Sequence, residues 1–450
     1  MRLGLAAVCT ILMLVIASFA AVAQDEGPRA APTAHITVNA LPAPISPQAG
    51  FNARKATDAY LARVNGAARS RSDSYFEGGY VLLFVDTIYA VAVSALLLWL
   101  GISAILRDFV QKLTPIRFLQ APLYAIVFFV LSSALTFPLT VYEQFVREHA
   151  YSLSNQTFMQ WLGDFTTGLA INLAAFAIVS ALVYTAIRAT PRYWWVWGTC
   201  IGILFFAFSA AIQPVFIEPL FNHYESLRPG PLKAEILSLA RAEGVPATDV
   251  YEFDASRQSS RISANVSGLF GTTRISLTDN LLKRCTPDEI VAVLGHEMGH
   301  YVLDHIALGI TWMGLLFLAG FAFVNWGFRL LAGLFGAAWG VRGIEDPAGL
   351  PVLMALLSVF SLLATPVMNT MSRTIETQAD IFGINAVRKP DAFAEVTLML
   401  SEYRKLDPGP LEEFLFYDHP SGRDRISMAM RWKAEHLNDI DIKDGPVSPR

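Results

Sequence analysis

Long stretches without a charged residue divide the chain into apolar and polar parts. Six of these stretches are 20 to 26 residues long. A helix that crosses the roughly 30 Å hydrocarbon layer of a membrane needs about 20 mostly apolar residues, because each residue adds about 1.5 Å. The pattern therefore predicts six transmembrane helices. They are Thr87–Leu106, Phe118–Tyr142, Phe165–Ile187, Tyr193–Ile217, Ile306–Phe328 and Pro347–Ser372.

A further apolar run, Leu3–Gln24, opens the chain and ends in Ala21-Val22-Ala23. Small residues in this pattern are typical of a signal-peptide cleavage site. Residues 1–24 are therefore either a signal peptide or an uncleaved signal anchor, and the number of spans is six or seven. Residues 25–78 are interpreted as a Pro/Ala-rich linker followed by a pre-membrane segment.

The polar residues gather in two parts that the spans separate. The first four spans occupy residues 79–217, and a polar stretch with helical and strand patterns, 218–305, follows them. A pair of spans, 306–372, leads to a second polar stretch, 373–450. Two crossings return the chain to the side it left, so the two polar stretches can form one domain on one membrane face.

The overall composition agrees with a membrane protein. Hydrophobic residues make up 54% of the chain and charged residues 16%, whereas soluble domains average about 25% charged residues. These values favour a multi-pass protein of the cell (inner) membrane. A net charge of −4 gives no basic surface for a nucleic-acid partner. The oligomeric state does not follow from the sequence.

The first polar stretch contains the motif H-E-x-x-H, formed by His296, Glu297 and His300. Thr286-Pro287-Asp288-Glu289 precedes it and predicts a helix start, because it offers a capping threonine, a proline at the first helical position and a glutamate that completes a capping box. On such a helix the two histidines lie on one face and can bind one Zn²⁺, while the glutamate can act on zinc-bound water.

A hydrolytic zinc site needs a third protein ligand. Glu376, which follows the last span, is the candidate for this ligand, and Asp380 lies four residues later on the same helical face. One carboxylate can bind zinc while the other accepts the free N–H of a ligating histidine. His305 is one position away from the spacing that would make it a ligand on the same helix.

Three motifs in this order resemble the type I CaaX prenyl endopeptidases and their bacterial relatives, a group of membrane gluzincins that includes HtpX-like proteases. They are Leu294-Gly295-His296-Glu297-Met298-Gly299-His300, Ser372-Arg373 with Glu376 and Ala379-Asp380, and His419-Pro420 with Arg425-Ile426. The resemblance implies a mainly α-helical, polytopic membrane protein. Its six or seven transmembrane helices would surround a chamber and carry a gluzincin-like α+β zinc protease domain.

The resemblance also implies the roles of individual residues. His296, His300 and Glu376 would bind one Zn²⁺, Glu297 would be the general base, and Asp380 would orient a ligand. His419 would stabilise the oxyanion, with Arg425 holding His419 in place, and Arg373 would brace Glu376. The family's substrate-binding edge strand matches Ser263–Leu269; Ser263 replaces the family's asparagine, and Asn265 is the candidate substrate-binding residue in its place.

The expected function is zinc-dependent hydrolysis of peptide bonds in a peptide or membrane-protein substrate beside the lipid bilayer. In bacteria this activity would serve membrane-protein processing or quality control rather than the maturation of prenylated proteins. Two alternatives are a site-two-type intramembrane protease, whose H-E-x-x-H would lie within a span, and a non-catalytic membrane scaffold with a metal site. A cleaved signal peptide would place the active site outside the cell, and a signal anchor would place it in the cytoplasm.

Overall fold

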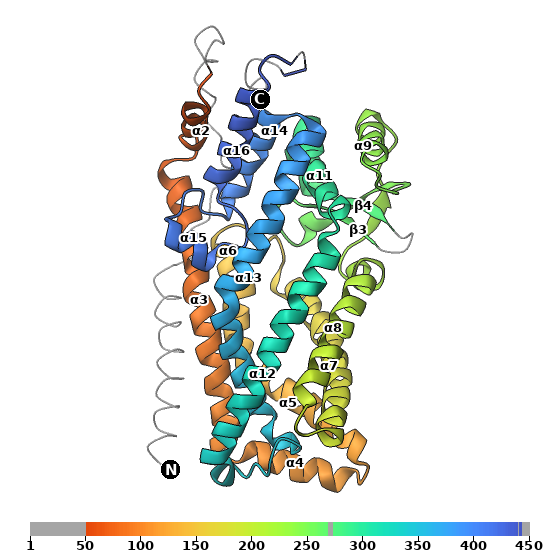
Figure 1. Ribbon diagram of the computed structural model, residues 1–450, viewed down its shortest axis with the longest axis vertical. Helices are drawn as coiled ribbons and strands as arrows, with labels where there is room; N and C mark the ends of the chain where they lie inside the picture. The colour runs from red at the N-terminus through yellow and green to blue at the C-terminus, as the bar shows by residue number, and fades with distance from the viewer. Residues whose placement is uncertain (1–50, 269–272, 440, 443–450) are drawn as a thin grey trace.

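The computed structural model describes residues 51–268, 273–439 and 441–442, so the expected signal segment and the linker up to residue 50 lie outside the described residues. Long helices form the lower part of the molecule, and a head of shorter helices and a small sheet lies at one end of them (Figure 1). The long helices α12 and α13 continue directly into this head.

The described chain is mainly helical, and the strands fall between α8 and α10. The α-helices are α2 (Ala53–Leu61), α3 (Gly66–Trp99), α4 (Ile102–Leu113), α5 (Arg117–Val141), α6 (Glu148–Ala150), α7 (Phe158–Ala189), α8 (Trp194–Ile212), α9 (Pro231–Ala242), α10 (Asp279–Arg284), α11 (Pro287–Val302), α12 (His305–Trp339), α13 (Leu350–Val387), α14 (Pro390–Met399), α15 (Pro410–Phe416) and α16 (Gly422–Glu435). The strands are β1 (Tyr224–Ser226), β2 (Val250–Phe253), β3 (Ala264–Ser267) and β4 (Arg274–Thr278).

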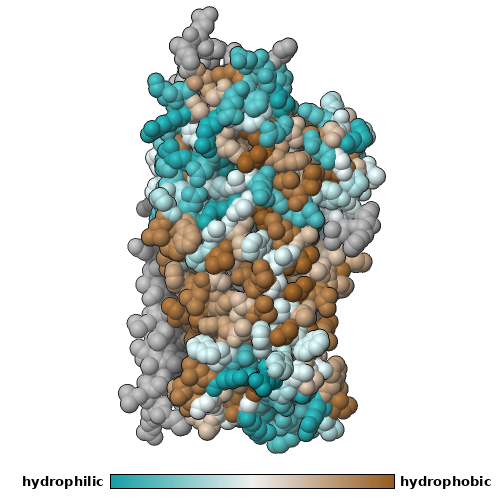
Figure 2. Space-filling view, in the orientation of Figure 1, coloured by the Kyte–Doolittle hydropathy of each residue, from teal (hydrophilic) through white to brown (hydrophobic). Residues whose placement is uncertain are grey.

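Six helices in the described residues are long and apolar enough to cross a membrane, which confirms the predicted six spans. They are Gly66–Trp99, Arg117–Ala150, Phe158–Ala189, Trp194–Leu220, His305–Trp339 and Pro347–Val387. A band of hydrophobic side chains covers these helices, and hydrophilic side chains gather at the head and at the opposite end (Figure 2). Large hydrophobic side chains exposed on this band, such as Leu204, Phe208 and Leu334, suit contact with lipid.

The bounds of the first span differ from the predicted run Thr87–Leu106. The structure starts α3 at Gly66 and ends it at Trp99, and Gly101 takes a left-handed conformation with φ 71° before α4 turns away. The charge-free run begins only at Thr87 and omits the first half of α3, because that half contains charged residues up to Asp86. It also joins α3 to α4 because the turn between them carries no charge.

The head contains a four-stranded sheet in the order β1-β2-β4-β3. Strand β3 pairs antiparallel with β4, with Ala264 opposite Leu277, and so forms one edge of the sheet. A buried apolar cluster that includes Ile275, Leu294 and Met298 packs the sheet against α11. This packing places the edge strand next to the helix that carries H-E-x-x-H.

The segment before the first span belongs to the head. Helix α2 packs on α16, and Tyr60 and Leu61 join a buried cluster with Phe393 of α14 and Ile426 of α16. Arg63 adds a bidentate ion pair with Glu395, at 2.5 and 2.8 Å. Residues 53–64 are therefore a folded part of the head, although the sequence pattern predicted only a pre-membrane segment there.

A cavity of about 520 Å³ lies between the membrane helices α5 and α7, below the head. Its lining includes the polar side chains of Gln144, Asp164 and Asn172. Asn325 on α12, in contrast, accepts a hydrogen bond from the Trp194 indole at 3.0 Å. Polar groups in the spans thus serve two purposes, because some line a cavity and others join neighbouring helices.

Candidate active site

Helix α11, which carries the H-E-x-x-H motif, begins with the capping box expected from the sequence. The Thr286 side chain accepts from the backbone N–H of Glu289, and the Glu289 carboxylate accepts from the backbone N–H of Thr286 at 2.8 Å. The helix ends at Val302, and α12 begins at His305 after Asp304 has turned the chain with φ 53°. The motif therefore precedes the membrane helix and lies outside the six candidate spans. A site-two-type protease needs the motif within a span, so this alternative does not fit.

Close contact between α11 and α13 brings the two halves of the site together. A Cβ atom added to Gly383 on α13 would lie 2.7 Å from the backbone nitrogen of His296, and one added to Gly299 on α11 would lie 3.1 Å from Cα of Ala379. Gly295 also faces Gly383, with 3.1 Å from its added Cβ to the Gly383 carbonyl oxygen. Only glycine allows the two backbones to approach this closely, and the approach sets the distance from the histidines to Glu376.

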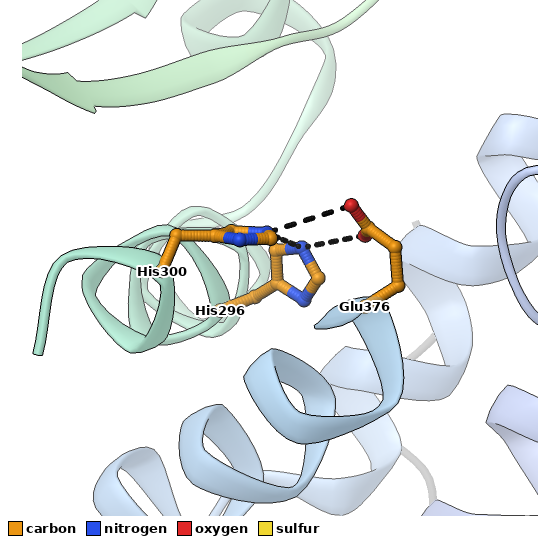
Figure 3. A group of neighbouring side chains, drawn as sticks. All are labelled: His296, His300 and Glu376. Atoms are coloured by element: carbon orange, nitrogen blue, oxygen red, sulfur yellow. Dashed lines mark hydrogen bonds and ion pairs between the residues drawn. The ribbon is translucent and has the colours of Figure 1, made fainter. Parts of the chain in front are cut away.

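Three side chains from these helices converge on one point (Figure 3). His296 Nε2 lies 3.1 Å from His300 Nε2 and 3.3 Å from Glu376 Oε2, and His300 Nε2 lies 3.7 Å from Glu376 Oε1. The Oε2 atom of Glu376 is buried and has no hydrogen-bond partner among the described residues. Two ring nitrogens and a carboxylate at these distances form a set of donors that fits a metal ion.

A second set of contacts fixes the histidine rings. Asp380 accepts a hydrogen bond from His296 Nδ1 at 2.7 Å, so the proton lies on Nδ1 and the lone pair of Nε2 faces the convergence point. Arg425 donates two hydrogen bonds to Asp380, at 2.8 and 2.5 Å. Both partners are buried, with 11% of the Arg425 side chain and 2% of the Asp380 side chain exposed.

His300 has a matching support, which its sequence spacing did not indicate. His305 Nε2 donates to Gln378 Oε1 at 3.1 Å, so neutral His305 presents an acceptor at Nδ1, and His300 Nδ1 lies 3.0 Å from it. A hydrogen bond from His300 Nδ1 to His305 Nδ1 leaves the lone pair of His300 Nε2 free, on the side of His296. The sequence excluded His305 as a ligand by its spacing, but the turn at Asp304 brings it back to the site as a support.

The pKa values of the motif residues reflect burial and the charges around them. Burial raises the pKa of Glu297 to about 7. Burial alone would lower the pKa of His296, but the Asp380 carboxylate and its hydrogen bond raise it to about 9. Burial and the neighbouring His296 lower the pKa of His300 to about 4. The negative charge of Asp380 thus favours positive charge at His296 Nε2, where a proton and a metal ion compete, while His300 stays neutral.

His419 lies beside the convergence point, as the sequence led us to expect. Its Nε2 is 3.3 Å from Glu376 Oε2, and its Nδ1 is 2.9 Å from Asp418. The expectation that Arg425 holds His419 differs from the structure, since the hydrogen bonds of Arg425 go to Asp380. The reason is geometric, because α16 directs Arg425 at the buried carboxylate of α13.

Arg373 also differs from its expected role. Its guanidinium donates to the backbone carbonyls of Glu413, at 2.8 Å, and Tyr417, rather than bracing Glu376. Asn369, one turn earlier on α13, donates to the Leu415 carbonyl at 2.8 Å. The two residues therefore attach the end of α15 to α13, and this attachment positions the following segment that carries His419.

A cavity of about 210 Å³ opens beside the motif. Its lining includes His296, Glu297 and the start of the edge strand, Ser263 and Ala264. Asn265 is absent from this lining, and its side-chain oxygen accepts a hydrogen bond from Ser267 at 3.4 Å. The structure therefore brings Ser263, rather than Asn265, to the cavity. Residues two apart share one face of a strand, so the difference lies in position along the chain: Asn265 lies further along β3, beyond the lining of the cavity.

Comparison with known proteins agrees with this architecture. Residues 226–433 match the model of peptidase family M48, and residues 57–223 match the model described as "CAAX prenyl protease N-terminal, five membrane helices". The second stretch contains four of the six long apolar helices of this chain. The two models together cover the membrane helices, both halves of the head and all nine candidate site residues.

Individual relatives point to the same family. The chain is 31% identical over 331 residues to the "Uncharacterized metalloprotease YhfN" of Bacillus subtilis, which covers 73% of this chain and 78% of the relative. It is 29% identical over 319 residues to "CAAX prenyl protease 1" of Saccharomyces cerevisiae, covering 66% and 69%. The crystal structure of S. mikatae Ste24p matches the fold with a TM-score of 0.66 at 22% identity, covering 84% of this chain and 94% of that one.

The family implies a metal cofactor, and the convergent donors of α11 and α13 fit one. The family also implies a peptide substrate, which excludes the alternative of a non-catalytic scaffold. The six apolar helices and the N-terminal family match place the protein in a membrane. The chain therefore belongs to peptidase family M48 and is a multi-pass membrane metalloendopeptidase.

Proposed function

We propose that this protease works with one Zn²⁺ held by His296, His300 and Glu376. The observation that carries the proposal is the spacing of the three donors. A tetrahedral ion with ligand bonds of 2.0–2.1 Å needs its donor atoms about 3.3 Å apart. The structure has 3.1 Å between the two ring nitrogens, 3.3 Å from His296 Nε2 to Oε2 of Glu376 and 3.7 Å from His300 Nε2 to Oε1 of the same carboxylate. Two imidazoles and one carboxylate also match the composition of catalytic zinc sites, which keep a fourth position open.

Glu297 is the proposed general base. It lies next to a ligand in sequence and lines the cavity where a peptide can bind. Bound zinc supplies a Lewis acid that polarises the scissile carbonyl and acidifies the attacking water. Glu297 takes the proton of this water and passes it to the leaving amine. Its raised pKa, about 7, suits both steps near neutral pH because the group can accept a proton and release it again.

His419, Asp380 and Arg425 assist this chemistry in the proposal. His419 lies beside the three donors, with its Nε2 3.3 Å from Glu376 Oε2, and can donate a hydrogen bond to the oxyanion that forms when water attacks. Asp380 keeps the proton of His296 on Nδ1, and Arg425 holds Asp380. Arg373 acts indirectly, because it anchors the segment that carries His419.

The proposed substrate binds as an added strand along β3. This strand is an edge of the sheet, and its first residues line the cavity beside Glu297. Strand addition relies on backbone groups, so it does not need an asparagine at position 263 or the side chain of Asn265, which accepts a hydrogen bond from Ser267. The strand therefore presents the peptide bond of many different sequences to the site.

We further propose that the substrates are membrane-associated polypeptides and that cleavage serves processing or quality control. The membrane helices α12 and α13 run directly into the site, so a polypeptide leaving the bilayer reaches Glu297 within the same molecule. The yeast relative is named for prenylated CaaX proteins, and a comparison of prenylated and unprenylated peptides of one sequence tests whether this chain needs the lipid. Equal cleavage supports processing, and strict dependence on the prenyl group contradicts it.

Orientation in the membrane is the last part of the proposal. Residues 53–64 pack on the head, so the start of α3 and the active site share one membrane face. We place this face in the cytoplasm and the proposed anchor at residues 1–24 as a seventh span of an inner-membrane protein. Protease protection of a C-terminal tag, together with the N-terminal sequence of the mature chain, tests both points.

The experiment for the catalytic site separates metal binding from proton transfer. Glu297→Gln should retain about one zinc ion per chain and lose peptide cleavage by at least about a hundredfold, the lower end for a lost general base. His296→Ala should lose both zinc and cleavage. Arg431→Gln, an exposed change on α16, is the matched control and should retain both. A zinc-loaded Glu297→Gln protein that cleaves at the normal rate contradicts the proposal.

A further inference from the structure

Arg404 lies beside the proposed catalytic site and forms no close ion pair among the described residues. Its terminal nitrogen is 3.5 Å from His419 Nε2, and its side chain lines the same 210 Å³ cavity as His296 and Glu297. Among the described residues, no carboxylate lies within the 4.0 Å that defines an ion pair with this guanidinium. The side chain is half-buried, so water compensates its charge only in part.

The neighbouring arginines make the contrast clear. Arg425, which lines the same cavity, pairs with Asp380 at 2.5 Å. Arg261 pairs with Glu148 at 2.7 Å, and Arg284 pairs with Glu402. Charges that leave bulk water are normally paired, because an uncompensated charge in a partly buried position is costly. Arg404 therefore differs from these three arginines, each of which has a carboxylate partner.

The fold holds Arg404 in this position. Its backbone carbonyl accepts a hydrogen bond from Ser72 of α3 at 3.1 Å. The next residue, Lys405, pairs with Glu412 at 2.8 Å and with Glu77 at 2.7 Å. These contacts fix the chain on both sides of the guanidinium, so its place at the cavity does not depend on an ion pair of its own.

The rest of the cavity is mostly apolar. Leu281, Val293, Phe393, Val396 and Leu400 form this part of its wall. With a volume of about 210 Å³, the cavity is large enough for one apolar residue of a peptide. A ligand that fills the cavity and reaches Arg404 is therefore apolar along its length and negatively charged at one end.

We propose that Arg404 binds a carboxylate of the peptide substrate, on the residue that fills the apolar cavity or shortly after it, and so makes the protease selective for substrates with a negative charge on the leaving side of the cleaved bond. The inference rests on the proposed peptidase function and adds a specificity residue to it. Guanidinium groups bind carboxylates through two parallel hydrogen bonds. The carboxylate can be the free C-terminus of the substrate or an acidic side chain, and the experiment distinguishes the two sources.

The test uses full-length, zinc-loaded protein in lipid nanodiscs and matched fluorogenic peptides. One series ends in a free carboxylate one, two or three residues after the cleaved bond, and a second series is identical but amidated. A third series is amidated and carries glutamate as its last residue. Wild-type kcat/KM should be about ten to a hundred times higher for at least one length of free acid than for its amide, the range expected for one hydrogen-bonded charge pair. Faster cleavage of the third series than of the amides identifies an acidic side chain as a source.

Variants assign the preference to Arg404. Arg404→Gln should abolish the difference between acid and amide, because kcat/KM falls for the free acids much more than for the amides, mainly through KM. Arg404→Lys should retain part of the preference because the charge remains while the two parallel hydrogen bonds do not. Arg431→Gln is the control and should retain the whole preference. Equal losses on acid and amide, mainly in kcat, would mean that Arg404 acts on the reacting atoms or on the fold, and would overturn the proposal.

A binding experiment separates this proposal from the proposed function. The variant Glu297→Gln should bind the free-acid form of an uncleaved tripeptide about tenfold or more tightly than the amide, and Glu297→Gln with Arg404→Gln should bind both alike. This readout needs no turnover. A wild-type protein that cleaves no peptide contradicts the proposed function alone, whereas equal binding of acid and amide to Glu297→Gln contradicts the role of Arg404 alone.

Discussion

The substitution Gly383→Ala should separate the two halves of the proposed metal site without changing the side chain of any proposed metal ligand. The added methyl group would lie 2.7 Å from the His296 backbone nitrogen and 2.9 Å from the Gly295 carbonyl carbon. Ordinary contact begins near 3.4 Å, so the new atom is about 0.7 Å too close. Both opposing atoms belong to the backbone of α11, which cannot rotate away as a side chain can. The helices must therefore move apart.

The expected effect follows from this displacement. Overpacking of this kind typically costs about 1–3 kcal/mol of stability. Metal sites tolerate only about 0.2 Å of change in ligand distance, and a separation of several tenths of an ångström between α11 and α13 exceeds that. We expect zinc affinity to fall at least about tenfold, as for the loss of a supporting contact around a metal. Cleavage should fall in proportion to the metal content at limiting zinc.

The assay measures zinc content after dialysis against graded chelator, cleavage of a fluorogenic peptide and the midpoint of thermal unfolding. The matched control is Gly333→Ala on α12, where an added Cβ meets no atom within 4 Å. In a helix this change is neutral or slightly stabilising. Normal zinc affinity and activity in Gly383→Ala would refute the argument that glycine sets the spacing of the site.

Three further predictions concern the residues around the metal. Arg425→Gln leaves the Asp380 carboxylate buried without its ion pair, so the free energy of unfolding should fall by about 3–5 kcal/mol and zinc affinity by about ten- to a hundredfold. Thermal unfolding and chelator titration measure the two effects. Unchanged zinc affinity contradicts the view that Arg425 supports His296 through Asp380. Arg373→Gln should lower kcat about tenfold, the equivalent of about 1.4 kcal/mol, with zinc content unchanged, since it loosens the segment of His419 only; parallel loss of zinc in the same preparation would mean that Arg373 supports the metal directly. Burial raises the pKa of Glu297 from 4.5 to about 7, and only the ionised carboxylate accepts a proton. The value of kcat/KM should therefore decrease as the pH falls, with a midpoint above 4.5 and no higher than about 7, because bound zinc lowers the pKa of Glu297 within that range. A wild-type pH profile with its midpoint at or below 4.5 contradicts this view.

The sequence predicted the features that depend on local spacing. The H-E-x-x-H helix and its cap follow from neighbouring residues, and the fourfold spacing of Glu376 and Asp380 follows from helical geometry. The six spans follow from their length and composition. The side chains of the site can then come together if the two polar stretches lie on one membrane face, which an even number of membrane crossings between them allows.

The features that depend on how helices cross could not be predicted in this way. Gly383 looks like an ordinary helical glycine until α11 is seen to lie against it. His305 has the wrong spacing for α11, and it supports His300 only because Asp304 turns the chain. Arg373 lies one turn from Glu376 but is directed at α15. For these residues the partners come from distant segments, and no local pattern reports them.

The packing of α2 on α14 and α16 makes the head a product of both ends of the described chain. Residues 53–64 are synthesised before any of the six long apolar helices and residues 390–435 after all of them. His419 and Arg425 also belong to this last part. A nascent chain that already carries H-E-x-x-H is therefore still without the segments that complete its site. The head can therefore be completed only after every one of these long apolar helices has been synthesised.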